Sequence, residues 1–169
     1  MSANRRLPIL CLTLLMCAVC APAAEEILLF GFNNATGGGI GPNGLTADAK
    51  GNLYGTTSDG LAFEVSPPKA AGGPWTETVL YQFTGGSDGG HPTSGLLIDS
   101  AGNLYGTAQV GGQSATYECY LAACGVVFEL SPPTQPGGGW TETTLYAFPG
   151  SPDGNIPWAG LIFDDAGNL

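Results

Sequence analysis

The sequence is poor in charge, and above all in positive charge. Only 11% of its 169 residues are charged, and four Lys and Arg stand against fourteen Asp and Glu. Proteins that bind nucleic acid or an anionic membrane surface need cations to contact phosphate groups. The shortage argues against both classes of partner. The excess of carboxylates favours solubility outside the cell.

Histidine and helical patterning are equally scarce. His91 is the only histidine, which excludes a metal site built from several histidines. After the first 23 residues, no stretch shows the 3.6-residue period that an amphipathic helix requires. Apolar, β-branched and aromatic runs alternate instead with turns, to which 28 Gly and 13 Pro contribute. This pattern predicts an all-β chain of many short strands.

Long hydrophobic runs are absent as well, because the one run near the N-terminus is short. Two arginines precede an apolar stretch over 7–19, which is followed by Ala21-Pro22-Ala23. A membrane-spanning helix needs about 20 apolar residues. We therefore interpret residues 1–23 as a secretory signal peptide, with a membrane anchor as the less favoured alternative. The protein is then secreted or held in the cell envelope, with no membrane insertion after the leader is removed.

Cleavage of that leader changes both the charge and the cysteine count. Two lysines remain against fourteen carboxylates, a formal charge of −12, and two of the five cysteines remain, Cys119 and Cys124. An even pair this close in an exported chain most simply forms a local disulfide.

What the sequence does contain is an internal repeat. The phrase Gly-Leu-x-x-Asp-x-x-Gly-Asn-Leu-Tyr-Gly-Thr occupies residues 95–107, is matched at 44–56 and begins again at 160–169. The copies are offset by 51 and then by 65 residues, and the additional 14 residues fall in the loop 109–124. Self-similarity of this period is the signature of a repeat architecture.

One complete unit holds four expected strands, at 95–99, 103–107, 125–130 and 140–148. Four antiparallel strands repeated in tandem predict β-propeller blades, with a two-sheet sandwich as the alternative. The expected organisation is a closing outer strand and loop at 24–43, a first blade at 44–83, a second at 95–148 and the start of a third at 160–169. Because closed rings have four to eight blades, we expect this chain to be the N-terminal part of a longer protein.

Several phrases per unit also carry a family resemblance. They are the hairpin phrase, Val-Phe-Glu-Leu-Ser-Pro-Pro at 127–133, Trp-Thr-Glu-Thr-x-Leu-Tyr-x-Phe at 140–148, and Asp-Gly-x-x-Pro at 88–92 and 153–157. Together they resemble the GloVer tandem repeat of bacterial exported proteins. The resemblance implies an exported, propeller-like protein, often with a C-terminal anchoring or sorting signal. It implies no catalytic residues.

Two sets of recurring carboxylates have a structural and a functional interpretation. Asp48, Asp99 and Asp164 precede the turn of each hairpin, where Asp caps backbone N–H groups; the alternative is a calcium ligand. Glu64 and Glu129 alternate with apolar residues, which predicts a solvent or channel face. The alternative for this second pair is two catalytic carboxylates of a glycosidase.

Topology also predicts where a ligand would bind. In an antiparallel four-stranded unit, the fourth-to-first and second-to-third connections lie at the same end. Loops 84–94 and 149–159 should therefore share a face with 109–124, and binding residues concentrate in such loops. The candidate ligand-binding residues there are Asp88, His91, Tyr117, Tyr120, Asp153, Asn155 and Trp158, which suit a carbohydrate or a peptide or protein ligand.

The function expected from these observations is a non-catalytic binding or scaffold module at the cell envelope or outside the cell. No cofactor and no metal ion are expected. One alternative is an envelope-associated carbohydrate-active enzyme whose catalytic residues lie in blades downstream. The other is a purely structural surface array.

Overall fold

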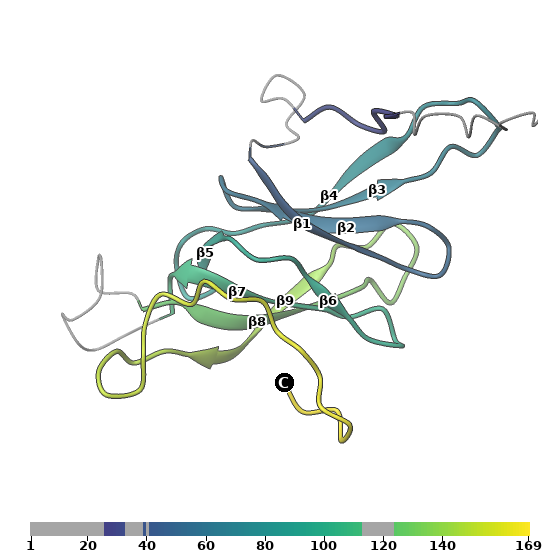
Figure 1. Cartoon of the computed structure of the whole chain (residues 1–169). Coiled ribbons are helices and arrows are strands. Elements are labelled where there is room, and N and C mark those ends of the chain that lie inside the picture. The colour runs from purple at the N-terminus through teal and green to yellow at the C-terminus, as the bar shows by residue number, and fades with distance from the viewer. Residues whose placement is uncertain (1–25, 33–38, 40, 113–123) are drawn as a thin grey trace, which may run out of the picture.

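The structure is a computed structural model that describes residues 26–32, 39, 41–112 and 124–169, and over these residues it is all-β (Figure 1). Nine strands and no helix form within that part of the chain, as the sequence predicts. It follows that none of the described segments is a helix of the length and apolarity needed to cross a membrane.

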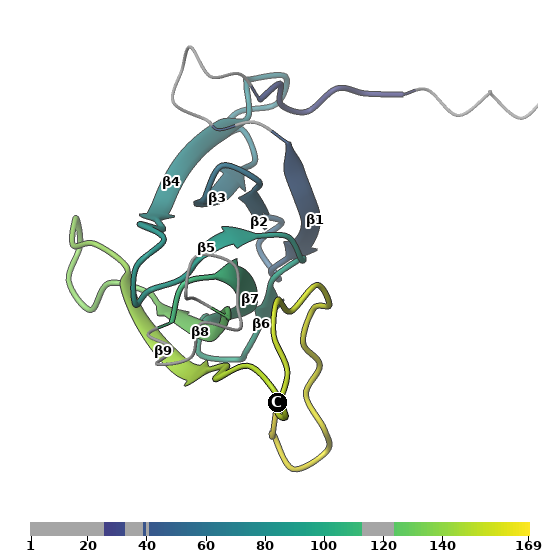
Figure 2. The same ribbon diagram turned by 90° about the vertical axis from the view of Figure 1, so that its left-hand side faces the viewer.

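The strands form two antiparallel sheets that pack face to face (Figures 1 and 2). Sheet A has the order β1-β2-β3-β4, and sheet B has the order β5-β7-β8-β9 with β6 also paired to β7. The strands of sheet A are β1 (Pro42–Ala47), β2 (Leu53–Thr57), β3 (Leu61–Ser66) and β4 (Thr76–Gln82). Those of sheet B are β5 (Gly90–Pro92), β6 (Leu97–Ile98), β7 (Leu104–Val110), β8 (Val126–Ser131) and β9 (Thr141–Ala147).

Each sheet corresponds to one sequence unit, and most of the expected strands are present. β7, β8 and β9 begin and end within three residues of the predicted 103–107, 125–130 and 140–148. The first strand of the unit differs, because only Leu97–Ile98 pairs within the predicted 95–99 while β5 pairs further along β7. β1 shows the same irregularity as a register shift between Pro42 and Leu45.

The break in the first strand lies at a close contact between the two units. A Cβ on Gly44 would lie 3.2 Å from the Cα of Gly95, so the first strands of the two units approach closely here. Thr56 Oγ1 donates a hydrogen bond to the carbonyl of Ser94 at 3.1 Å across the same contact. The carbonyl of Ser94, in the gap between β5 and β6, is thus bonded to the other sheet.

The third unit contacts the second in the same way. Thr107 Oγ1 donates to the carbonyl of Ala159 at 2.9 Å, which repeats the Thr56–Ser94 bond one unit later. Residues 160–169 form no strand, but the hydrogen bond from Asp164 N to Asn168 O, at 2.9 Å, closes the expected turn.

The core lies between the two sheets and depends on one aromatic contact. The rings of Phe83, just after β4, and Phe128, on β8, lie 4.7 Å apart at 57°. Leu80 from sheet A and Leu96, Leu104 and Leu130 from sheet B are buried beside them. Leu80 lies at a register shift of the β3–β4 pair, a bulge that recurs in β8–β9 at Leu145.

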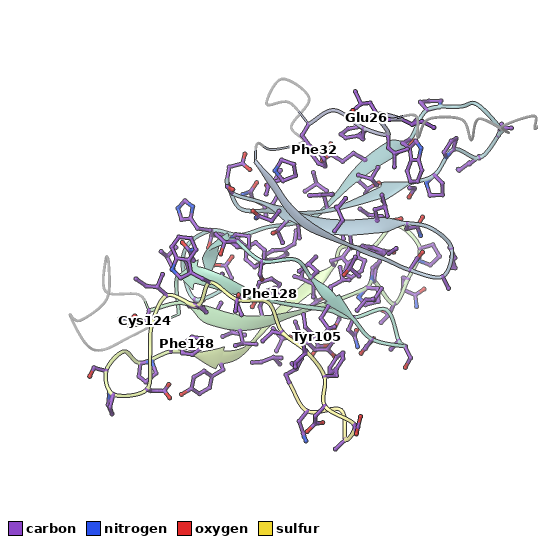
Figure 3. All side chains as sticks on the ribbon, in the orientation of Figure 1. Glu26, Phe32, Tyr105, Cys124, Phe128 and Phe148 are labelled. Carbon is purple, nitrogen blue, oxygen red and sulfur yellow. The ribbon has the colours of Figure 1, made fainter. Side chains whose placement is uncertain are left out.

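Residues 26–32 form no strand, although the sequence predicts one. Among the described residues no strand lies beside this segment to share its backbone hydrogen bonds. Its Phe32 nevertheless packs on sheet A as Phe83, at the end of β4, packs on sheet B. Phe32 and Phe63 lie 4.7 Å apart at 58°, almost the geometry of Phe83 and Phe128 (Figure 3).

Gly106 lies against the Phe128 ring and leaves the space that the packing of Phe128 on Phe83 requires. A Cβ on Gly106 would lie 2.6 Å from Cζ of the fully buried Phe128 and 3.0 Å from Cδ2 of Leu96, which is also buried. We predict that Gly106→Ala lowers the free energy of unfolding by about 1–3 kcal/mol through overpacking. Urea denaturation followed by circular dichroism measures this change in the free energy of unfolding.

Gly139→Ala is the matched control, because a Cβ there meets nothing within 4 Å. We expect its free energy of unfolding to stay within about 0.5 kcal/mol of the parent protein. Equal destabilisation by both variants would show that loss of glycine itself, and not the contact with Phe128, is responsible.

Candidate ligand-binding site

The hairpin Asp is a turn residue. Asp99 Oδ1 accepts hydrogen bonds from the backbone N–H groups of Ala101 and Asn103, each at 2.8 Å. Its Oδ2 accepts from Asn103 Nδ2 at 2.9 Å and from the Tyr105 hydroxyl at 3.1 Å. Gly102 follows with φ of 88°, a conformation that glycine adopts without strain.

The other two copies of this turn are built alike. Asp48 accepts four hydrogen bonds from Lys50, Asn52 and Tyr54, and Asp164 accepts three from Ala166 and Asn168. These carboxylate oxygens are therefore engaged within their own turns. No cluster of three or more potential metal ligands occurs anywhere in the described part of the chain.

The turn network shifts the ionisation of its members. Burial acts to raise the pKa of Asp99, but hydrogen bonds from Asn103, Tyr105 and Ala101 favour the charged form and bring the pKa below its usual value. Burial, and then the nearby Glu64 and Asp48, raise the pKa of Tyr54 to about 12. Each tyrosine thus remains a neutral hydrogen-bond donor to its aspartate.

Glu64 and Glu129 lie on the third strand of each sheet and are half-buried. Each accepts a hydrogen bond from the serine two residues later, Ser66 at 2.6 Å and Ser131 at 2.9 Å. They therefore hold equivalent positions on two different sheets.

At the other end of the sheets, the loops meet as topology predicts. The N–H of Phe83 donates to the carbonyl of Gly60 at 2.9 Å, which joins the end of β4 to the β2–β3 turn. The N–H of Gly112 donates to Gly86 O at 3.0 Å, which joins the long β7–β8 connection to loop 84–94. The fourth-to-first and second-to-third loops share one end.

The predicted binding residues differ in how available they are. Asp88 is buried, and Thr84 donates to it through its N–H at 2.8 Å and its hydroxyl at 2.5 Å. The hydroxyl of Tyr81 adds a third bond at 3.2 Å. Asp88 therefore organises its own loop, a role that its position in a loop does not reveal.

Three of the predicted residues lie at the surface of the next loop. Asp153 is exposed and accepts a hydrogen bond from the Tyr146 hydroxyl at 2.6 Å. Asn155 is also exposed, and Trp158 keeps 71% of its surface accessible. These side chains are free of the core and available to a ligand.

His91 belongs to a separate pocket of about 310 Å³ between the first two units. It shares this pocket with Asp59 and Thr84. Its Nδ1 lies 3.1 Å from the carbonyl of Ser58; because a carbonyl only accepts, Nδ1 carries the proton. Sequence reasoning missed Asp59, whose only signal was its place in the turn opposite loop 84–94.

Two residues at equivalent positions of successive loops have a left-handed backbone conformation. His91 has φ of 51°, and Ile156, its equivalent one unit later, has φ of 50°. For the branched side chain of Ile156 this conformation is a genuine outlier, whereas histidine is among the residues that adopt it more often. Because the left-handed conformation recurs at both positions, it belongs to the fold of the loop.

The remaining predicted site residues lie in or beside the β7–β8 connection. Tyr117, Tyr120 and Cys119 are outside the described residues. Cys124 is described and is fully buried. The disulfide between Cys119 and Cys124 stays a prediction.

Comparison of the chain with protein-family models, with curated proteins and with solved structures finds no match. The resemblance to the GloVer repeat therefore stays a hypothesis.

The turn network predicts a dependence of stability on pH. A carboxyl whose pKa is lowered by folding stabilises the folded state above its unfolded pKa, and this contribution is lost as the pH falls through the folded pKa. We predict that Asp99→Asn costs about 1 kcal/mol of unfolding free energy at pH 7, since the hydrogen bonds to a half-buried charge are weakened. The difference from the parent protein should shrink as the pH is lowered below about 4.

Unfolding in urea at a series of pH values tests this prediction. Asp165→Asn is the matched control, because Asp165 is an exposed residue of the third turn. A pH-independent difference for Asp99→Asn would mean that the charge of Asp99 has no part in holding the turn.

Proposed function

We propose that the two sheets are consecutive blades of a β-propeller. Three pairs of equivalent contacts support this. The Phe32–Phe63 pair matches Phe83–Phe128 in distance and angle. The Thr56–Ser94 bond matches Thr107–Ala159, and the Gly44–Gly95 approach is followed by Gly160 against Gly95. Successive units related by one repeated operation generate a ring if the rotation closes.

Residues 26–32 are, in this proposal, the outer strand that closes the ring. They lie over sheet A (Figure 1), beside Leu45 of β1, Leu53 of β2 and Val65 of β3. Phe32 takes there the position that Phe83 takes on sheet B. Leu45 on sheet A is 55% exposed, whereas its equivalent Leu96 on sheet B is 4% exposed. The outer face of sheet A is thus only partly covered, as expected of a blade on which a further blade would pack.

We further propose that the protein is an exported binding or scaffold module that does not transform its ligand. The observation that carries this proposal is that the recurring aspartates are occupied by hydrogen bonds within their own turns and loops. The signal-peptide pattern and the GloVer resemblance support export to the cell envelope or beyond. The exposed loop residues Asp153, Asn155 and Trp158 offer a surface for carbohydrate or peptide.

Binding without turnover is tested on the exported protein with arrays of glycans and peptides and with matched hydrolysis assays. We expect at least one ligand class to be retained, and Trp158→Ala to weaken that binding about tenfold, as loss of a central aromatic contact does. Ile162→Ala is the control, since Ile162 is 81% exposed but lies outside the loop.

Two results would contradict the proposal. Hydrolysis that a single carboxylate substitution, such as Glu64→Gln or Glu129→Gln, abolishes would identify an enzyme. Binding that Ile162→Ala weakens as much as Trp158→Ala would place the ligand elsewhere.

A further inference from the structure

A groove lies between two hairpin turns, at the end of the sheets opposite loops 84–94 and 149–159. It has a volume of about 490 Å³ and separates the hairpin turn of the first unit from that of the second. Its walls come from both turns and from the β8–β9 connection. The residues that bear on its chemistry are Asp48, Lys50, Tyr54, Asp99, Ser100 and Trp140.

The same groove recurs one unit later. A space of about 430 Å³ lies between the second and third hairpins, with Tyr105 in the place of Tyr54 and Phe163 in the place of Ile98. The rings of Tyr105 and Phe163 lie 5.4 Å apart, edge to face. The groove is therefore a product of the repeat, and its shape alone indicates no ligand.

Two side chains of the first groove break the repeat, and of these Lys50 lines the first groove alone whereas Ser100 lines both grooves. Lys50 stands where the other turns have Ala101 and Ala166, and Ser100 stands where the first turn has Ala49. In all three turns the backbone N–H at this position donates a hydrogen bond to the aspartate two residues earlier, whether the residue is lysine or alanine. Because folding needs no lysine there, its ammonium group is available to a ligand.

Charge determines which ligand fits. Asp48 and Asp99 both have lowered pKa values, through hydrogen bonds that outweigh the effect of burial, so both are negative at neutral pH. With one lysine the groove is not positive, and the chain as a whole carries a formal charge of −10. An anionic polymer is therefore repelled. Cation binding is disfavoured because the oxygens of both aspartates already accept hydrogen bonds.

We propose that this groove binds a neutral oligosaccharide. Trp140 is half-buried, packs against the core and lines the groove, so it supplies a fixed aromatic surface for the apolar face of a sugar ring. The Lys50 ammonium group and the Ser100 hydroxyl supply donors and an acceptor for sugar hydroxyls. The site is separate from the loop surface around Trp158 and does not depend on it.

The test measures binding affinity on the whole exported chain by calorimetric titration. The ligands are cellohexaose, chitohexaose, mannohexaose and xylohexaose. At least one should bind. Trp140→Phe keeps the packing on the core but shortens the aromatic surface and removes the indole N–H, and Lys50→Ala installs the residue of the other turns. Each should weaken binding about tenfold, the equivalent of one good hydrogen bond to a charged group.

Matched controls separate this groove from other effects. Trp75→Phe changes the equivalent tryptophan of the first unit, and Lys69→Ala removes the other lysine of the described chain; neither residue lines the groove. Both should leave the affinity within about twofold. The proposal is wrong if no hexasaccharide binds at millimolar concentration, or if Trp75→Phe weakens binding as much as Trp140→Phe.

Discussion

The structure depends on the packing of one sheet against the next through a pair of phenylalanines. The ring that follows the last strand of one unit lies on the ring of the third strand of the next, as Phe83 lies on Phe128. Gly106 leaves the space that the second ring requires. Neither sheet could bury its apolar face alone, which is the general reason that repeat units are stable only in series.

This constraint explains the most conspicuous phrase of the sequence. In the hairpin the aspartate and asparagine close the turn, the tyrosine donates to the aspartate, and the glycine before the threonine accommodates the phenylalanine ring. The threonine then bonds to the next unit. Positions that recur are thus accounted for by folding, so that function is best sought where the copies differ, as at Lys50 and Ser100.

The sequence was sufficient for the strands whose partners lie nearby and for the turn between them. β7, β8 and β9 and the shared end of the loops follow from local patterning and connectivity. The break in the first strand does not, because it lies where Gly95 closely approaches Gly44 of another unit, a contact that local patterning does not reveal. The role of Asp88 was also hidden, since its partners Tyr81 and Thr84 become visible only when the loop is folded.

Residues 26–32 also show that local sequence does not determine strand formation. Their β-strand composition is clear, but a strand needs a partner, and none lies beside them among the described residues. Their aromatic side chains still adopt the unit-to-unit geometry, with Phe30 and Phe32 edge to face at 5.2 Å as Tyr81 and Phe83 are at 5.1 Å. Side-chain packing therefore positions this segment without backbone pairing.

We infer that successive units pack on one another by one repeated contact between phenylalanine rings. Two double-mutant cycles, Phe83→Leu with Phe128→Leu and Phe32→Leu with Phe63→Leu, measure that contact directly as coupling energies of unfolding. We expect couplings of about 0.5–1.5 kcal/mol for both pairs, the range of aromatic contacts beyond their buried area. A coupling near zero for Phe32 with Phe63, beside a clear one for Phe83 with Phe128, would contradict it.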